Sequence, residues 1–176
     1  MIILRHIVSI LLLPTTVTVV VPYLILSSSP LQPVSSAGLR LLQVIAVIAG
    51  LALLAGGLVL VCSTIRQFAR IGRGTLAPWD PPKHLVLAGV YKHVRNPMIS
   101  GVLLILLGET LVFRSLGLLV WLVVFFAINA IYIPLIEEEG LERRFGDEYR
   151  EYKRHVGRWM PRIKAWEPPW DQGSNR

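Results

Sequence analysis

Cysteine and charge are both scarce in this sequence. Its 176 residues include one cysteine, Cys62, which excludes an intrachain disulfide framework and a zinc site built from several cysteines. Charged residues make up 16% of the chain, whereas soluble domains have about 25%. Disordered chains are polar and poor in aliphatic residues, so a hydrophobic content of 53% excludes disorder. A soluble globule also fits poorly, because the apolar residues come in runs too long for so small a core.

The common nucleotide- and metal-binding motifs are missing as well. No G-x-G-x-x-G follows a strand pattern, and the sequence has neither a G-x-x-x-x-G-K-[ST] phosphate loop nor an H-E-x-x-H zinc motif. The four histidines show no metal-ligand spacing, so we expect no metal site. Any chemistry in this chain therefore needs a different kind of site.

Long apolar runs are what the sequence does contain. A membrane-spanning helix needs about 20 apolar residues at 1.5 Å each. We predict an all-α, polytopic membrane protein with four such helices, at residues 7–26, 41–65, 97–113 and 116–136. The two-residue link between the last two runs predicts an antiparallel hairpin. A competing interpretation makes residues 1–26 a cleaved signal peptide, but no small-residue cleavage site follows them.

The basic residues lie almost entirely on one side of these runs. The chain has 18 Lys and Arg against 11 Asp and Glu, a net charge of +7. Only Arg40 and Arg114 fall in the two loops that would share one side of the membrane. By the positive-inside rule, we expect an integral membrane protein with cytoplasmic N- and C-termini. Because topology explains the positive charge, we expect membrane lipids and no nucleic acid as partners.

The first cytoplasmic segment, residues 66–96, leads into the third apolar run. Its prolines and glycines predict an irregular connection. Asn96 is expected to be the N-cap of the next helix, with Pro97 at its first position. The free backbone N–H groups beside Arg95 would suit a carboxylate or a phosphate. The alternative is a basic collar that only contacts lipid headgroups.

The second cytoplasmic segment begins at Glu137. Apolar residues then recur every three or four positions, which predicts a C-terminal amphipathic helix: Leu141, Phe145, Tyr149, Tyr152, Val156 and Trp159. A helix lying on the bilayer surface would explain this stripe. It would not explain the three carboxylates at 137–139, because charge at the rim of a membrane span is costly and usually functional.

Two sequence blocks carry a family resemblance. Residues 85–98 read LVLAGVYKHVRNPM, which is similar to the pattern L-V-x-x-G-x-Y-x-x-x-R-H/N-P. The second block begins at Glu137-Glu138 and continues through Phe145-Gly146 to Val156, with Pro161 close behind. One helical hairpin separates the blocks. Together they resemble the isoprenylcysteine carboxyl methyltransferase and phospholipid methyltransferase superfamily of integral membrane enzymes.

The resemblance implies an S-adenosylmethionine-dependent methyltransferase whose lipophilic acceptor enters from the bilayer. It divides the chain into two N-terminal transmembrane helices (1–65), a methyltransferase core (66–164) and a tail (165–176). The cofactor contacts it implies are Lys83, His84, Leu85, Val86, Tyr91, Asn96, Pro97, Met98, Ile99 and Glu137. We take Arg95, Asn129 and Glu138 as candidate catalytic residues. Arg95 lies beside the helix start, and Asn129 lines the acceptor cleft or bonds across helices. Glu138, or Glu139 next to it, is the candidate general base.

Two positions depart from the family pattern. Asn96 replaces the usual histidine, which keeps hydrogen bonding and capping but removes a titratable ring. Ile133 stands where the prenylcysteine enzymes carry an arginine that contacts the substrate carboxylate, which argues against a prenylcysteine acceptor. Two other functions stay open: a small membrane scaffold or lipid-binding protein, and a sterol-reductase-like dinucleotide enzyme, although such reductases have more spans than 176 residues allow.

Overall fold

The described part of the chain is helical and contains no strand. The structure is a computed structural model that describes residues 11–28, 37–67, 70–71 and 85–169. In chain order, its elements are η1 (Leu11–Val20), α2 (Val21–Ser28), α3 (Ala37–Gln67), η3 (Gly89–Lys92), α4 (Pro97–Phe113), α5 (Leu116–Tyr132), η4 (Ile133–Glu137) and α6 (Glu138–His155). The all-α prediction is confirmed for these residues.

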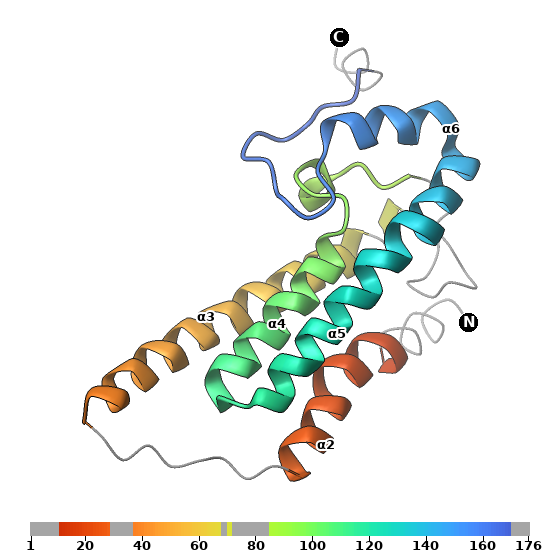
Figure 1. The fold of residues 1–176 in the computed structure, drawn as a ribbon. Coiled ribbons are helices and arrows are strands. Elements are labelled where there is room, and N and C mark those ends of the chain that lie inside the picture. The colour runs from red at the N-terminus through yellow and green to blue at the C-terminus, as the bar shows by residue number, and fades with distance from the viewer. Residues whose placement is uncertain (1–10, 29–36, 68–69, 72–84, 170–176) are drawn as a thin grey trace.

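The described residues of the four predicted apolar runs lie on helices (Figure 1), and residues 7–10 of the first run lie outside the described part. Two helices are long and apolar enough to cross a membrane, Arg40–Gln67 and the continuous helix Leu116–His155. The apolar helices Pro14–Ser28 and Pro97–Phe113 have fewer than 18 residues, so they are short for a membrane span. Membrane association therefore has support from two helices, and the count of four spans stays a prediction.

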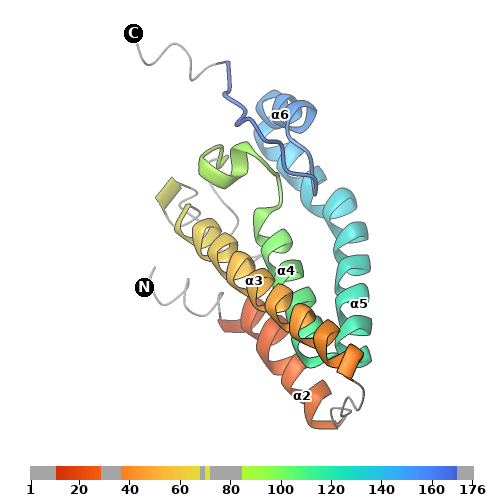
Figure 2. The ribbon, with the colours of Figure 1, turned by 90° about the vertical axis from the view of Figure 1, so that its left-hand side faces the viewer.

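Close packing of α3 on α4 forms the centre of the bundle (Figure 2). A Cβ on Gly57 would lie 2.7 Å from the carbonyl oxygen of Gly101, and one on Gly50 would lie 2.8 Å from that of Gly108. Small residues at these crossings let two helix backbones approach closely, as is common between helices in lipid. Val61 of α3 packs beside them in a buried apolar cluster with Val102, Ile105 and Leu106.

The last apolar helix does not end where its apolar run ends. Pro134 has no N–H and its ring excludes a regular α-turn, so η4 is a wider π-turn in which the Glu138 N–H bonds to the Ile133 carbonyl. The chain continues directly into α6 (Figure 1). Gly146 bends α6 at φ 54° and ψ −127°, a conformation that is rare for residues with a side chain.

The bend folds the amphipathic stripe back onto the segment before α4. Tyr149, Tyr152 and Val156 form a buried cluster with Trp166, against which Leu85 and Leu87 pack. The apolar stripe of α6 therefore packs against other parts of the protein as well as any membrane surface. Trp166 and Pro168 are buried too, so residues beyond 164 contribute to this packing.

Candidate functional site

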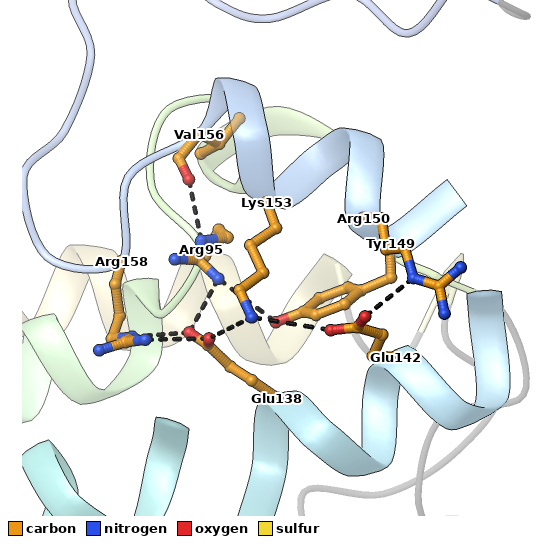
Figure 3. A network of polar contacts seen from close by, with 8 residues as sticks. All are labelled: Arg95, Glu138, Glu142, Tyr149, Arg150, Lys153, Val156 and Arg158. Atoms are coloured by element: carbon orange, nitrogen blue, oxygen red, sulfur yellow. Dashed lines mark hydrogen bonds and ion pairs between the residues drawn. The ribbon is translucent and has the colours of Figure 1, made fainter. Parts of the chain in front are cut away.

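We call the end of the bundle where α3 ends and α4 begins the basic end. A buried ion cluster there joins the two sequence blocks that carry the family resemblance (Figure 3). Glu138, only 2% exposed, lies at its centre. Arg95 Nη1 donates to Glu138 Oε1 at 2.8 Å. Arg158 donates from Nε to Oε1 at 2.6 Å and from Nη2 to Oε2 at 3.0 Å. Lys153 Nζ lies 3.5 Å from Oε2. Three cations thus surround one carboxylate.

This cluster keeps Glu138 ionised. Burial alone would raise the pKa of its carboxyl, but the hydrogen bond from Arg158 and the charges of Arg95 and Arg158 outweigh burial and lower it. A carboxylate with a lowered pKa, already accepting three hydrogen bonds, is a weak proton acceptor. The geometry gives Glu138 the role of a structural anchor for the two arginines.

Arg95 also fixes the chain on either side of α6. Its Nε donates to the Val156 carbonyl at 2.8 Å, and its backbone N–H donates to the Gly157 carbonyl at 2.9 Å. One residue therefore ties the start of α4 to the end of α6 and, through Glu138, to the beginning of α6. The Arg95 side chain is 8% exposed, so little of it is left for a ligand to contact.

The start of α4 is correctly predicted, but the capping bond is not. The helix begins at Pro97 with Asn96 as N-cap, and the Asn96 side chain makes no capping hydrogen bond. The backbone of Asn96 (φ −118°, ψ 62°) departs from the extended conformation usual for an N-cap. Its Nδ2 atom is buried without a partner. Buried amide donors are normally satisfied, so this atom is available to a bound polar group.

Tyr91 and Glu137 lie at the same end of the bundle. Tyr91 is buried in η3, and its carbonyl accepts a 2.7 Å hydrogen bond from the Tyr152 hydroxyl. Burial, then the neighbouring Tyr152 and the charge of Glu137, raise the pKa of the Tyr91 hydroxyl. Glu137 keeps an exposed side chain, yet desolvation by the surrounding protein and repulsion from Glu138 raise the pKa of its carboxyl. Glu137 is therefore the more basic of the two adjacent carboxylates.

The remaining predicted residues fall into three groups. Leu85 and Val86 precede η3, with Val86 buried, and Pro97, Met98 and Ile99 form the first turn of α4. Lys83 and His84 lie outside the described residues. Asn129 donates from Nδ2 to the Phe125 carbonyl of its own helix at 2.8 Å, and no hydrogen bond joins it to Arg95 or Glu138.

Two residues of this end were missed by the sequence analysis. Arg158 follows the amphipathic helix, and nothing in the local sequence shows that its partner lies 20 residues earlier. Gln67, the last residue of α3, packs against Gly89, whose φ of 53° suits glycine. The Gln67 Oε1 atom is buried without a partner. The sequence signal that could have identified Gln67 is its position, a polar residue at the end of an apolar run.

The apolar groove of about 570 Å³ between α2 and α5 lies away from this cluster. Its lining residues are Ile25, Leu116, Gly117, Val120, Trp121 and Val124. Ile25 belongs to α2 and the other five to the first half of α5, whereas Glu138 follows the far end of α5. Within the described part of the chain, no three His, Cys, Asp or Glu side chains are grouped to hold a metal ion.

The long apolar helices and the buried polar cluster at one end are features of a helical, membrane-associated protein. A family model for phospholipid methyltransferases matches residues 45–148, more than half of the sequence. The chain belongs to the phospholipid methyltransferase family, so it is a membrane methyltransferase, and the superfamily resemblance of its two blocks is confirmed.

Other comparisons add little about function. An uncharacterized protein of Haemophilus influenzae is 45% identical over 64 residues, which are 36% of this chain and 100% of that protein. No solved structure matches the chain.

Proposed function

We propose that this membrane methyltransferase transfers a methyl group from S-adenosylmethionine to a lipophilic acceptor that reaches the basic end from the bilayer. The observation that carries the proposal is the Arg95–Glu138 ion pair, which joins the two resembling blocks directly beside an apolar helix. The family supports methyl transfer over a scaffold or reductase role. We place the basic end, and with it both termini, on the cytoplasmic side, where positive loops are favoured.

The side chains at this end suit the polar parts of S-adenosylmethionine. The buried Asn96 Nδ2 is a free donor and the buried Gln67 Oε1 is a free acceptor. The N-terminus of α4 favours a carboxylate, and Glu137 suits an ammonium or ribose hydroxyls. We keep as proposed cofactor contacts Lys83, His84, Leu85, Val86, Tyr91, Asn96, Pro97, Met98, Ile99 and Glu137, and add Gln67.

When bound, S-adenosylmethionine supplies a methyl group on a sulfonium that is already a good leaving group. The protein's main task is then to hold the acceptor in line and to exclude water. Such alignment can supply about 7–11 kcal/mol of the barrier. The cross-links from Arg95 to Val156, Gly157 and Glu138 make the floor of the site rigid. We assign Arg95 and Glu138 as positioning residues on this ground.

The proton acceptor, where the acceptor group needs one, is better assigned to Glu137 than to Glu138. Neighbouring carboxyls whose pKa values are pushed apart commonly divide such roles. Glu138 is held as a carboxylate by its arginines, whereas desolvation by the surrounding protein and the charge of Glu138 raise the pKa of Glu137. Asn129, one helical turn before Ile133, stays a proposed lining residue of the acceptor cleft.

The acceptor is proposed to be a lipid without a carboxylate at the reacting end. Ile133 is completely buried, so the position offers no charge to an anion. The two arginines of the cluster, Arg95 and Arg158, are already paired with Glu138. A reacting amine or hydroxyl therefore fits better than the carboxylate of a prenylcysteine.

Binding of S-adenosylmethionine to the purified full-length protein in detergent tests the proposal. Calorimetry should show saturable binding to the unchanged chain and to Glu139→Gln, and much weaker binding to Glu137→Gln. These variants make the same chemical change at neighbouring exposed carboxylates. No binding to the unchanged chain would contradict the proposal, and stabilisation by NADPH alone would support the reductase.

A further inference from the structure

The loop of residues 157–162, which we call the tip loop, carries an apolar tip that the active site does not use. It follows α6, and its Trp159 ring packs on the Phe126 ring of α5 with centroids 5.7 Å apart and planes at 54°. The next residue, Met160, is 80% exposed. A tryptophan from the polar end of the chain therefore lies against the apolar helix.

Phe126 lies deep in that helix. Residues 126 and 136 are separated by about 15 Å along the axis, at 1.5 Å per residue. Large apolar side chains are more than half exposed on both sides of Phe126: Val120, Val123, Ile128, Ile131, Leu135 and Ile136. Such a continuous exposed apolar surface belongs to a helix in contact with lipid. The Trp159 ring thus lies beside this lipid-facing band, at Phe126, ten positions before Ile136.

Hydrogen bonds fix both sides of the tip loop. Arg158 is held by Glu138, as described above. The Arg162 N–H donates to the His93 carbonyl at 3.0 Å, and its Nη1 donates to the His155 carbonyl at 3.0 Å. The exposure of Met160 is therefore a property of an anchored loop. The charge of Arg162 is the one that anionic headgroups can attract, because Arg158 is already paired with Glu138.

We propose that Trp159 and Met160 insert into the bilayer beside α5, with Arg158 and Arg162 at the level of the lipid headgroups. Tryptophan is enriched at membrane interfaces, and long basic side chains reach from there to the headgroups. The surface continues the lipid-facing band of α5, which makes the bilayer its partner. Because Arg158 also holds Glu138, the loop links bilayer contact to the buried ion cluster. This inference stands without the proposed cofactor or acceptor.

An environment-sensitive fluorophore on the tip tests the inference. In a Cys62→Ser background, Met160→Cys and Asp147→Cys would each be labelled with NBD and the full chain reconstituted in phospholipid vesicles. Asp147 is the matched control, because its side chain is 96% exposed at the bend of α6. We expect NBD at 160 to emit at shorter wavelength than at 147. It should be quenched by lipids carrying a nitroxide on the acyl chain and protected from aqueous iodide.

A second measurement leaves the loop unchanged. Vesicles containing a lipid with a photoreactive diazirine in its acyl chain should, after illumination, give cross-links to Trp159 or Met160 detectable by peptide mass spectrometry. Iodide-accessible NBD at 160 together with no cross-link in the tip loop would overturn the inference. A tip shielded from both iodide and nitroxide lipids would show that it packs on a second copy of the chain, which would also overturn it.

Discussion

Arg95 and Glu138 form an ion pair of 2.8 Å in which both side chains are more than nine-tenths buried. They stand 43 residues apart in sequence, one before α4 and the other at the first position of α6. The contact closes the helical hairpin at the basic end and brings the start of one sequence block to the other. The proposed site depends on this closure.

Removing the charge of Glu138 should destabilise the protein strongly. Glu138→Gln leaves Arg95 and Arg158 without their counter-charge, and breaking a buried pair in this way costs about 3–5 kcal/mol. Glu139→Gln is the control, since Glu139 pairs with Arg143 on the surface, where a pair contributes about 0–1 kcal/mol. Thermal unfolding in detergent should separate the two variants widely. Equal midpoints would contradict the anchoring role of Glu138.

Acid should remove the same stabilisation. Because the folded-state pKa of Glu138 lies below the ordinary value of 4.5, its contribution is fully present above that pH. The contribution is lost as the pH falls through the lowered pKa. Unfolding midpoints measured from neutral pH downward should therefore fall more steeply for the unchanged chain than for Glu138→Gln. Parallel curves would show that another group controls the acid sensitivity.

Two adjacent glycines of α3 should respond very differently to a methyl group. In Gly57→Ala, the new Cβ meets the Gly101 carbonyl oxygen and Ile105 Cγ1 at 2.7 Å each, so α3 and α4 must move apart. In Gly56→Ala it meets nothing within 4 Å. Overpacking of this kind typically costs about 1–3 kcal/mol. Unfolding midpoints should show a loss for Gly57→Ala alone, and a similar loss for both would contradict the described helix contact.

The Tyr152 hydroxyl should matter for cofactor affinity through Tyr91. Tyr152→Phe leaves the buried Tyr91 carbonyl without its 2.7 Å donor, which costs about 1–3 kcal/mol. We expect lower stability and weaker S-adenosylmethionine binding by calorimetry, because η3 loses its support. Tyr132→Phe, at a more exposed tyrosine of α5, should change neither. Weakened stability with unchanged binding would show that Tyr91 is not part of the cofactor site.

The sequence could predict the parts of this structure that local patterns determine. Long apolar runs located the helices, and Asn96-Pro97 placed the start of α4 at the correct residue. The position of Arg158 could not be predicted, because its partner Glu138 is reached only after α6 bends at Gly146. The missing capping bond of Asn96 could not be predicted either: its neighbour Arg95 is bonded to the Gly157 carbonyl, a long-range contact that the local sequence does not show.

Transfer of a labelled methyl group to lipid tests the central claim most directly. The full-length protein would be reconstituted in vesicles made from extracted membrane lipids. S-adenosylmethionine with a labelled methyl group would then be added outside the vesicles, where the basic end of outward-oriented molecules is exposed. The account predicts that label appears in the lipid extract with the unchanged chain and with Glu139→Gln, and that little appears with Glu137→Gln. Absence of label from the lipid extract while the protein binds the cofactor would contradict a lipophilic acceptor.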